Sequence, residues 1–209
     1  MVAFDRVDRN PTAHPMKKRR MNGSRYLLIK ASADQIPLRD NSVRLVIATP
    51  PIFGVKHRPK ADYCTSDLKE YDLFITRFLT QATKIVQPRG YILLIESRIE
   101  PRGSKGARRI IFHVLQKQIL HGRWTHQRIR SDTFLTHFLD VKDFPWWALS
   151  LRLYRNLIQQ YSHLGDIVVH VFSGSGNGAI AALDLGRRPI LIDLHYHRQV
   201  ERRLRKRIQ

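Results

Sequence analysis

Short apolar runs alternate along the first half of the chain with a longer segment in which apolar residues recur at helical spacing. Tyr26–Ile29, Val43–Ala48 and Tyr91–Ile95 are apolar runs rich in branched residues, and each predicts a buried strand. Asp67–Gln87 has the helical pattern, and a Pro-Arg-Gly sequence follows it. Because parallel strands are joined by crossover helices, this order predicts an α/β sheet with helices on both faces.

The second half repeats the alternation around a glycine-rich loop. The predicted elements are, in order, a helix from about Trp146 to His163, a strand over Asp166–Phe172, a helix over Ala179–Leu185, a strand over Pro189–Leu194 and a basic amphipathic helix that ends the chain. Glycines at positions 174, 176 and 178 separate the first of these strands from the helix that follows. We therefore predict a βαβ unit with a flexible-backbone loop at its first turn.

The segment between the two halves has a less regular pattern. We predict a helix from Ala107 to about Leu120, followed by a polar, basic stretch. The chain then divides into a basic arm over residues 1–25, a first half over 26–97, a basic insert over 98–140 and a second half over 141–209. On length alone, 209 residues favour one domain with an elaboration over two complete domains.

Net charge narrows the class of partner. The chain has 37 Lys and Arg against 17 Asp and Glu, a formal charge of +20. Self-repulsion of this size is relieved by a polyanion, so nucleic acid is the leading partner and an anionic membrane surface the second. Residues 1–30, 98–130 and 187–209 hold eight, nine and eight of the basic residues. The predicted contact with the polyanion therefore involves both halves.

Composition also argues against several classes of protein and of site. With 43% hydrophobic residues the chain can bury a core, which argues against a disordered basic tail. Cys64 is the single cysteine, so there is no intrachain disulfide and no Cys-rich zinc site, and the histidines lack metal-ligand spacing. No apolar run approaches the roughly 20 residues of a membrane helix, and the first residues do not resemble a signal peptide. We expect a cytoplasmic protein without a metal.

The glycine-rich loop is the first candidate site. Its glycines allow close approach of the backbone to a ligand, and Asp193 follows 19 residues after Gly174, at the end of the next predicted strand. An acid at that spacing accepts hydrogen bonds from ribose hydroxyls, so the combination favours an adenosine-containing ligand. The alternative is a tight turn with a purely structural purpose.

The second candidate site is the sequence Thr49-Pro50-Pro51-Ile52, which follows the predicted strand Val43–Ala48. Two consecutive prolines remove two N–H donors and leave carbonyl oxygens as acceptors. The Thr49 hydroxyl and the Pro50 carbonyl are suited to accept hydrogen bonds from an exocyclic amino group. The alternative is a Pro-Pro turn that only ends the strand.

Together these motifs resemble the amino-methyltransferases of DNA, in the permuted order of their β class. The resemblance extends from about Tyr26 to Arg207, and its segments are Asp40–Pro51, Phe144–Pro145, Leu151–Tyr161, Gly165–Asp166, Phe172–Gly176, Ala181–Ala182, Leu185–Arg188 and Ile192–Asp193. It implies a Rossmann-like α/β fold that uses S-adenosyl-L-methionine, with the catalytic half before the cofactor half and a small basic recognition insert between them.

The resemblance also implies roles for individual residues. The cofactor would contact Phe172, Ser173, Gly174, Ser175, Gly176, Asn177 and Asp193, and the target base would contact Thr49, Pro50, Pro51 and Ile52. The insert would bind DNA through Arg108, Arg109, Arg123, Arg128 and Arg130. The target nucleotide would be flipped out of the double helix, since its amino group is otherwise unreachable. Restriction-modification is the biological setting that this family implies.

Three positions depart from the family pattern. Ile52 stands where the family has an aromatic residue, His170 where it has an acid before the glycine loop, and Ser32 where it has an acid after the first strand. These departures favour a second hypothesis, a catalytically degenerate protein that binds nucleic acid or regulates. Methylation of RNA is a third. For the enzyme, the Thr-Pro-Pro sequence slightly favours N4 of cytosine over N6 of adenine.

Overall fold

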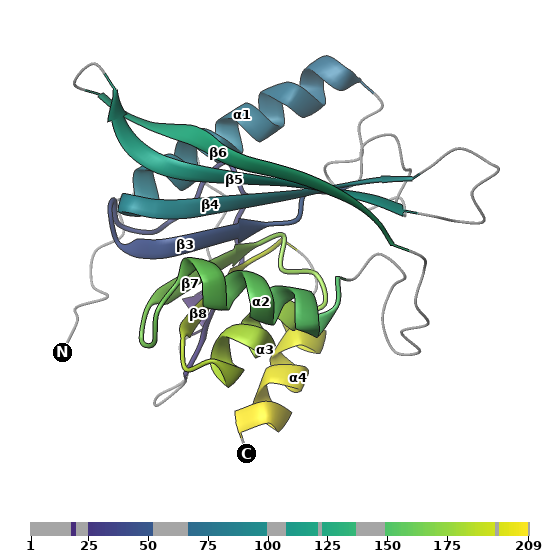
Figure 1. The fold of residues 1–209 in the computed structure, drawn as a ribbon. Helices are drawn as coiled ribbons and strands as arrows, with labels where there is room; N and C mark the ends of the chain where they lie inside the picture. Colours follow the sequence, from purple (N-terminus) through teal and green to yellow (C-terminus); the bar gives the residue numbers. More distant parts are fainter. Residues whose placement is uncertain are drawn as a thin grey trace.

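The computed structural model describes residues 18–19, 25–51, 67–99, 108–120, 123–136, 149–194 and 197–208. The strands are β1 (Lys18–Arg19), β2 (Leu27–Ile29), β3 (Val43–Ala48), β4 (Val86–Ile99), β5 (Arg108–Leu120), β6 (Arg123–Thr136), β7 (Ile167–Val171) and β8 (Arg188–Ile192). The helices are α1 (Leu68–Ile85), α2 (Leu151–Tyr161), α3 (Asn177–Asp184) and α4 (His197–Ile208). The described strands form one sheet, with helices above and below it (Figure 1).

Side-chain alternation along β3 explains the two layers of core. Val46 and Ala48 point to the face covered by α1, where Phe78 is fully buried. Leu45 and Ile47 point to the opposite face, which α2 and α3 cover. Apart from the half-buried Arg44, every residue of β3 is apolar and buried, and such a strand is stable only when both of its faces are covered. The predicted α/β class, with a sheet covered on both faces, is confirmed.

The order of strands places a switch point in the middle of the sheet. The order is β1-β2-β8-β7-β3-β4-β5-β6, and neighbouring pairs from β2 to β4 are parallel. From β7 the chain crosses through α3 to β8 on one side, whereas from β3 it crosses through α1 to β4 on the other. Ligands of such sheets bind where the crossovers diverge, beyond the carboxyl ends of the strands.

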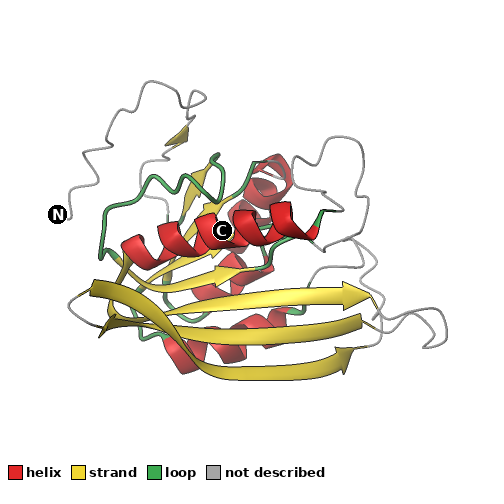
Figure 2. Cartoon of the chain, turned by 90° about the horizontal axis from the view of Figure 1, so that it is seen from above, coloured by secondary structure: helices red, strands yellow, loops and turns green. Residues whose placement is uncertain are grey.

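The predicted helix over residues 107–120 is wrong, because this segment forms β5. It pairs antiparallel with β4 on one side and with β6 on the other, and Figure 2 shows these three long strands side by side. The apolar residues of Ile110–Leu115 satisfy a strand pattern as well as a helical one. Pairing with β4 selects the strand over the helix. This neighbour extends from Val86 to Ile99, well beyond the predicted Tyr91–Ile95, and offers a long edge for hydrogen bonding.

Strand β5 places the buried side chain of Lys117 against the carboxyl end of α1. Its side chain is 2% exposed, and its ammonium nitrogen Nζ donates to Asn41 Oδ1 at 2.7 Å and to the Val86 carbonyl at 2.8 Å. A third bond, of 3.4 Å, reaches the Lys84 carbonyl in the last turn of α1. Burial lowers the pKa of Lys117, and the charge of Asp40 opposes this. The lysine therefore caps the carboxyl end of α1, where helix carbonyls lack partners.

Most other helices and strands begin and end within one to a few residues of their predicted bounds. Within the predicted basic arm, β1 pairs antiparallel with β2. Helix α2 begins at Leu151, where Ser150 caps it by accepting from the Leu153 amide, and the predicted start of this helix at Trp146 lies outside the described residues. The basic helix that we predict at the end of the chain is α4. Among the described residues, no helix has the length and apolarity required to cross a bilayer.

Candidate functional site

Both motifs predicted from the sequence lie at the switch point. Thr49 follows β3, and Phe172 follows the neighbouring strand β7. The Thr49 hydroxyl donates to the Phe172 carbonyl at 3.1 Å, and the Thr49 amide donates to the Val171 carbonyl at 3.4 Å. Thr49 is half-buried, and Pro50 beside it is buried. The structure thus joins two segments that lie 123 residues apart in the chain.

Phe172 directs the chain from β7 into the glycine loop. Its φ of 57° lies in the left-handed region, which costs a residue with a side chain about 1–2 kcal/mol. Packing offsets this cost, since the ring makes edge contacts with Phe74 at 5.7 Å and Phe78 at 5.8 Å between ring centroids. Its amide also donates to the Ile192 carbonyl at 3.0 Å. These ring contacts and the amide hydrogen bond together fix the partly buried Phe172.

The three glycines of the loop are needed for two physical reasons, a left-handed backbone and close packing. Gly174 and Gly176 have φ values of 46° and 78°, which favour glycine over any other residue. A Cβ on Gly176 would also lie 2.8 Å from Val200 of α4. At Gly178 the backbone is helical, but a Cβ would lie 2.7 Å from the His170 ring. Close packing within the protein therefore accounts for Gly178, which we had assigned to approach of a ligand.

Arg203 of α4 supports the loop from the side. Its guanidinium donates to the Ser175 carbonyl and, at 3.0 Å, to Asn177 Oδ1. The amide nitrogen of Asn177 donates in turn to the Leu149 carbonyl at 2.8 Å. Both polar ends of the Asn177 side chain are thus used inside the protein. This residue braces the loop, in addition to any contact with a ligand.

Asp193 lies beside the loop, immediately after β8. Its Oδ2 accepts from the Gly174 amide at 3.1 Å and from the Ser173 hydroxyl at 3.5 Å. Its own amide donates to the Ile29 carbonyl at 3.2 Å, which ties the end of β8 to the end of β2. The carboxylate is half-buried at the sheet edge, where the sequence analysis expected an acid.

After β2, the position expected to carry an acid is occupied by Ser32. Its hydroxyl donates to Asp34 Oδ1, and both side chains are half-buried. Ala31 and Ala33 on either side of Ser32 are buried in the core. A carboxylate is therefore present at this edge, two residues later than in the family pattern.

His170 does not replace the acid expected before the loop. It lies on β7 with its side chain 2% exposed, against Gly178 and 5.0 Å from the ring of Tyr154. Neither ring nitrogen has a hydrogen-bond partner among the described residues, and burial lowers the pKa of His170 to about 4. The imidazole is neutral and enclosed in the layer between β7 and α2. It therefore offers no charge to a ligand.

Comparisons with known proteins find similarity to DNA methylases. Residues 147–201, which span α2, the glycine loop, Asp193 and the start of α4, match a family model described as DNA methylase. A putative DNA modification methylase from Thermus thermophilus, solved in complex with S-adenosyl-L-methionine, superposes with a TM-score of 0.55 at 15% identity, covering 85% of this chain and 93% of that one. The chain has a DNA methyltransferase fold.

Two further solved structures share this methyltransferase fold. M1.HpyAVI in complex with S-adenosylmethionine gives a TM-score of 0.54 at 15% identity, with 86% of this chain and 98% of that chain covered. The PvuII DNA methyltransferase, described as cytosine-N4-specific, gives a TM-score of 0.50 at 12% identity, with 82% and 83% covered. No curated protein matches the sequence. The resemblance to DNA amino-methyltransferases inferred from the sequence is confirmed.

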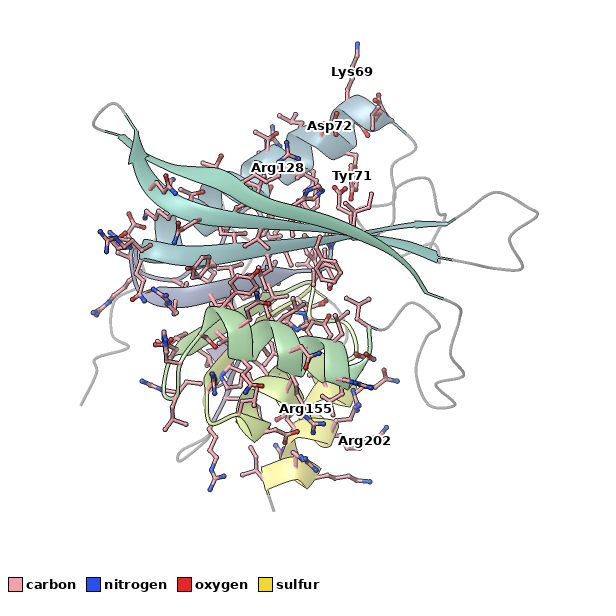
Figure 3. The ribbon with its side chains drawn as sticks, viewed as in Figure 1. Lys69, Tyr71, Asp72, Arg128, Arg155 and Arg202 are labelled. Carbon is pink, nitrogen blue, oxygen red and sulfur yellow. The ribbon has the colours of Figure 1, made fainter. Side chains whose placement is uncertain are left out.

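The remaining site residues predicted from the sequence are the end of the Thr-Pro-Pro-Ile motif and the DNA-binding arginines. Pro51 is half-buried and Ile52 lies outside the described residues. Arg128 is exposed on β6, near α1 in Figure 3. The four remaining predicted DNA contacts lie on strands β5 (Arg108 and Arg109) and β6 (Arg123 and Arg130).

Sequence reasoning missed two contributors to the site. Tyr71 of α1 donates its hydroxyl to the Pro51 carbonyl at 3.3 Å, although its helical spacing predicted only a core residue. Arg203 belongs to the predicted basic amphipathic helix, for which the sequence predicts no contact with the site, yet it contacts the glycine loop. A tyrosine among the apolar positions of a helix is a weak signal for a polar role, and one arginine in a run of arginines gives none.

Proposed function

We propose that the protein is an S-adenosyl-L-methionine-dependent DNA amino-methyltransferase. The observation that carries this proposal is the hydrogen bond from the Thr49 hydroxyl to the Phe172 carbonyl at 3.1 Å. A hydroxyl has one proton, and with that proton directed at Phe172 the Thr49 oxygen meets a ligand only as an acceptor. An exocyclic amino group of a base is a donor of the matching kind.

The residues at the glycine loop fit the proposed cofactor. Ribose hydroxyls are donors, and Asp193 presents a half-buried carboxylate next to the loop. A carboxylate accepts up to about four hydrogen bonds, so anchoring the loop and binding a ribose are compatible roles. We assign contacts with the methionine part to Phe172, Ser173, Gly174, Ser175, Gly176 and Asn177. When bound, the cofactor supplies an electrophilic sulfonium methyl group.

The protein's own contribution is positioning and polarisation. Thr49 and the Pro50 carbonyl accept the N–H bonds of the target amino group, which directs its nitrogen lone pair away from them and toward the loop after β7. We also assign contact with the target base to Pro51 and Ile52, as the resemblance implies. The hydrogen bonds also stabilise positive charge as it develops on the nitrogen. No side chain needs to become a covalent nucleophile in this scheme.

Double-stranded DNA is the proposed substrate, with the target base flipped out. Affinity comes from the basic residues of the three blocks, including Arg108, Arg109, Arg123, Arg128 and Arg130. This electrostatic part falls steeply with salt, whereas base selectivity depends on the Thr-Pro-Pro site and the β5–β6 region. We favour N4 of cytosine over N6 of adenine, on the Thr-Pro-Pro sequence. We also propose the permuted order of halves, since β3 and Thr49 precede β7 and its loop.

The direct test uses purified protein, methyl-labelled S-adenosylmethionine and unmethylated duplex DNA, followed by digestion to nucleosides. The proposal expects label in N4-methyl-2′-deoxycytidine or N6-methyl-2′-deoxyadenosine from the digested DNA. Parallel incubation with RNA of the same sequence separates the two substrates, and label in RNA alone contradicts the DNA assignment. A heat-treated sample is the control for label that binds without transfer.

A second candidate function rests on His170. The family carries an acid at this position, and here a neutral, buried imidazole without hydrogen-bond partners takes its place. A protein that lost cofactor chemistry and retained its basic surface would bind DNA and transfer nothing. Calorimetry distinguishes the two: the enzyme binds S-adenosylmethionine at micromolar to sub-millimolar concentration, whereas the degenerate protein binds DNA and shows no heat with the cofactor.

A further inference from the structure

Helix α1 contacts the loops of both motifs along one stripe of aromatic residues. Tyr71, Phe74 and Phe78 lie on one face of the helix, at spacings of three and four residues. Phe74 and Phe78 make edge contacts with the ring of Phe172, which leads into the glycine loop. Tyr71 donates its hydroxyl to the carbonyl of Pro51, in the Thr-Pro-Pro loop. One rigid element therefore supports both sides of the proposed site.

The Pro51 contact has special weight because of the loop's composition. Pro50 and Pro51 have no N–H groups, so the loop cannot be fixed by donors of its own at these positions. A carbonyl of the loop is fixed only when a donor from elsewhere reaches it. The Tyr71 phenol, 3.3 Å from the Pro51 oxygen, is such a donor. Figure 3 shows Tyr71 projecting from α1 toward the sheet, whereas Lys69 points away from it.

We propose that Tyr71 is a positioning residue for methyl transfer. By holding the Pro51 carbonyl, it fixes the Pro50–Pro51 unit and, through it, the acceptors that Thr49 and Pro50 present to the target amino group. The inference rests on the proposed function and adds to it a residue of α1 that the Thr-Pro-Pro motif does not contain. It assigns the hydroxyl, rather than the ring, to this task.

The distinction between hydroxyl and ring gives the test. Tyr71→Phe removes the hydroxyl and keeps the ring against the core, while Tyr71→Leu removes both. Each variant is assayed for kcat and for KM of DNA with labelled cofactor, for cofactor Kd by calorimetry without DNA, and for Tm. We expect Tyr71→Phe to lower kcat about three- to thirtyfold, which corresponds to losing one hydrogen bond plus some alignment. Its cofactor Kd and Tm should stay at the wild-type values.

Phe74→Leu is the matched control for a purely structural effect on α1. It weakens the contact with Phe172, so its cofactor Kd and Tm should change together, a pattern that Tyr71→Phe should not show. If Tyr71→Phe has the wild-type kcat, or if only Tyr71→Leu loses activity, the hydroxyl has no positioning role. Wild-type protein that transfers no methyl group overturns the proposed function and this inference with it. Active wild type with an unaffected Tyr71→Phe overturns this inference alone.

Discussion

Thr49 and Phe172 lie 123 residues apart in the chain, and the hydroxyl of one donates to the carbonyl of the other at 3.1 Å. This bond connects the ends of neighbouring parallel strands at the point where the crossovers of the sheet diverge. It fixes the direction of the Thr49 proton and ties the proposed base site to the proposed cofactor loop.

Replacing Thr49 with valine keeps the shape of the side chain and removes its oxygen. We expect Thr49→Val to lower kcat about 10- to 100-fold, because the target amine loses one acceptor and the loops lose their hydrogen bond. Thr49→Ser keeps the oxygen and should retain most of the activity. The measurement is single-turnover methyl transfer at saturating cofactor.

Thr80→Val is the control for the Thr49 variants. Thr80 is exposed on α1 and also donates its hydroxyl to a backbone carbonyl, that of Thr76, at 2.9 Å. The same chemical change there should leave methyl transfer unchanged. Equal rates for Thr49→Val and wild type contradict the role of Thr49 as an acceptor.

Arg203→Met should weaken cofactor binding. The guanidinium holds the Ser175 carbonyl and Asn177, so its loss releases one side of the glycine loop. We expect the cofactor Kd to rise about three- to tenfold, which corresponds to one supporting hydrogen bond. Arg202→Met makes the same charge change at the neighbouring exposed position of α4 and should leave the cofactor Kd unaltered. Calorimetry with S-adenosylmethionine in the absence of DNA checks both.

His170 predicts a specific loss of stability in acid. Burial lowers the pKa of His170 to about 4 in the folded protein, against an ordinary value near 6.5. Between these values the unfolded chain binds a proton that the folded protein does not bind. The free energy of unfolding is therefore highest above about pH 6.5 and falls as the pH drops toward 4, by up to about 3 kcal/mol from this residue.

The check is urea unfolding of wild type and His170→Leu across pH 4–7. The leucine variant should lose this part of the pH dependence and be at least as stable as wild type at pH 7, since it removes two buried nitrogens without partners. An unchanged slope in His170→Leu refutes the assignment.

Lys117→Met should destabilise the fold although it removes a buried charge. The three acceptors around the Nζ group lose this donor, although the Lys84 carbonyl keeps its bond from the Asn41 amide, and we expect a loss of about 1–3 kcal/mol in the free energy of unfolding. Lys84→Met makes the same change at an exposed lysine of the same helix end and should alter stability by less than about 0.5 kcal/mol. Denaturant titration at pH 7 measures both variants, and equal stabilities rule out the capping role.

The local sequence pattern was sufficient to predict the structure where that pattern is compatible with only one backbone conformation. The strand over Val43–Ala48 has the predicted bounds, because it is a short run of branched and other apolar residues, interrupted by Arg44, that has no competing helical pattern. The turn from β7 into α3 was also found, since Gly174 and Gly176 take backbone conformations that other residues avoid. Pattern failed over residues 107–120, where the apolar spacing suits two structures and the edge of β4 selects the strand.

The sequence by itself determined an α/β protein with a strong positive charge, a Thr-Pro-Pro sequence after one strand and a glycine loop with an acid after another. Only the tertiary structure decided which side chains meet at those loops. Tyr71 and Arg203 lie on helices, 20 and 28 residues along the chain from the loop carbonyls that they contact, and His170 turns into the core instead of toward a ligand. Residue spacing reports the local backbone, whereas these contacts depend on how whole helices pack on the sheet, which no local spacing records.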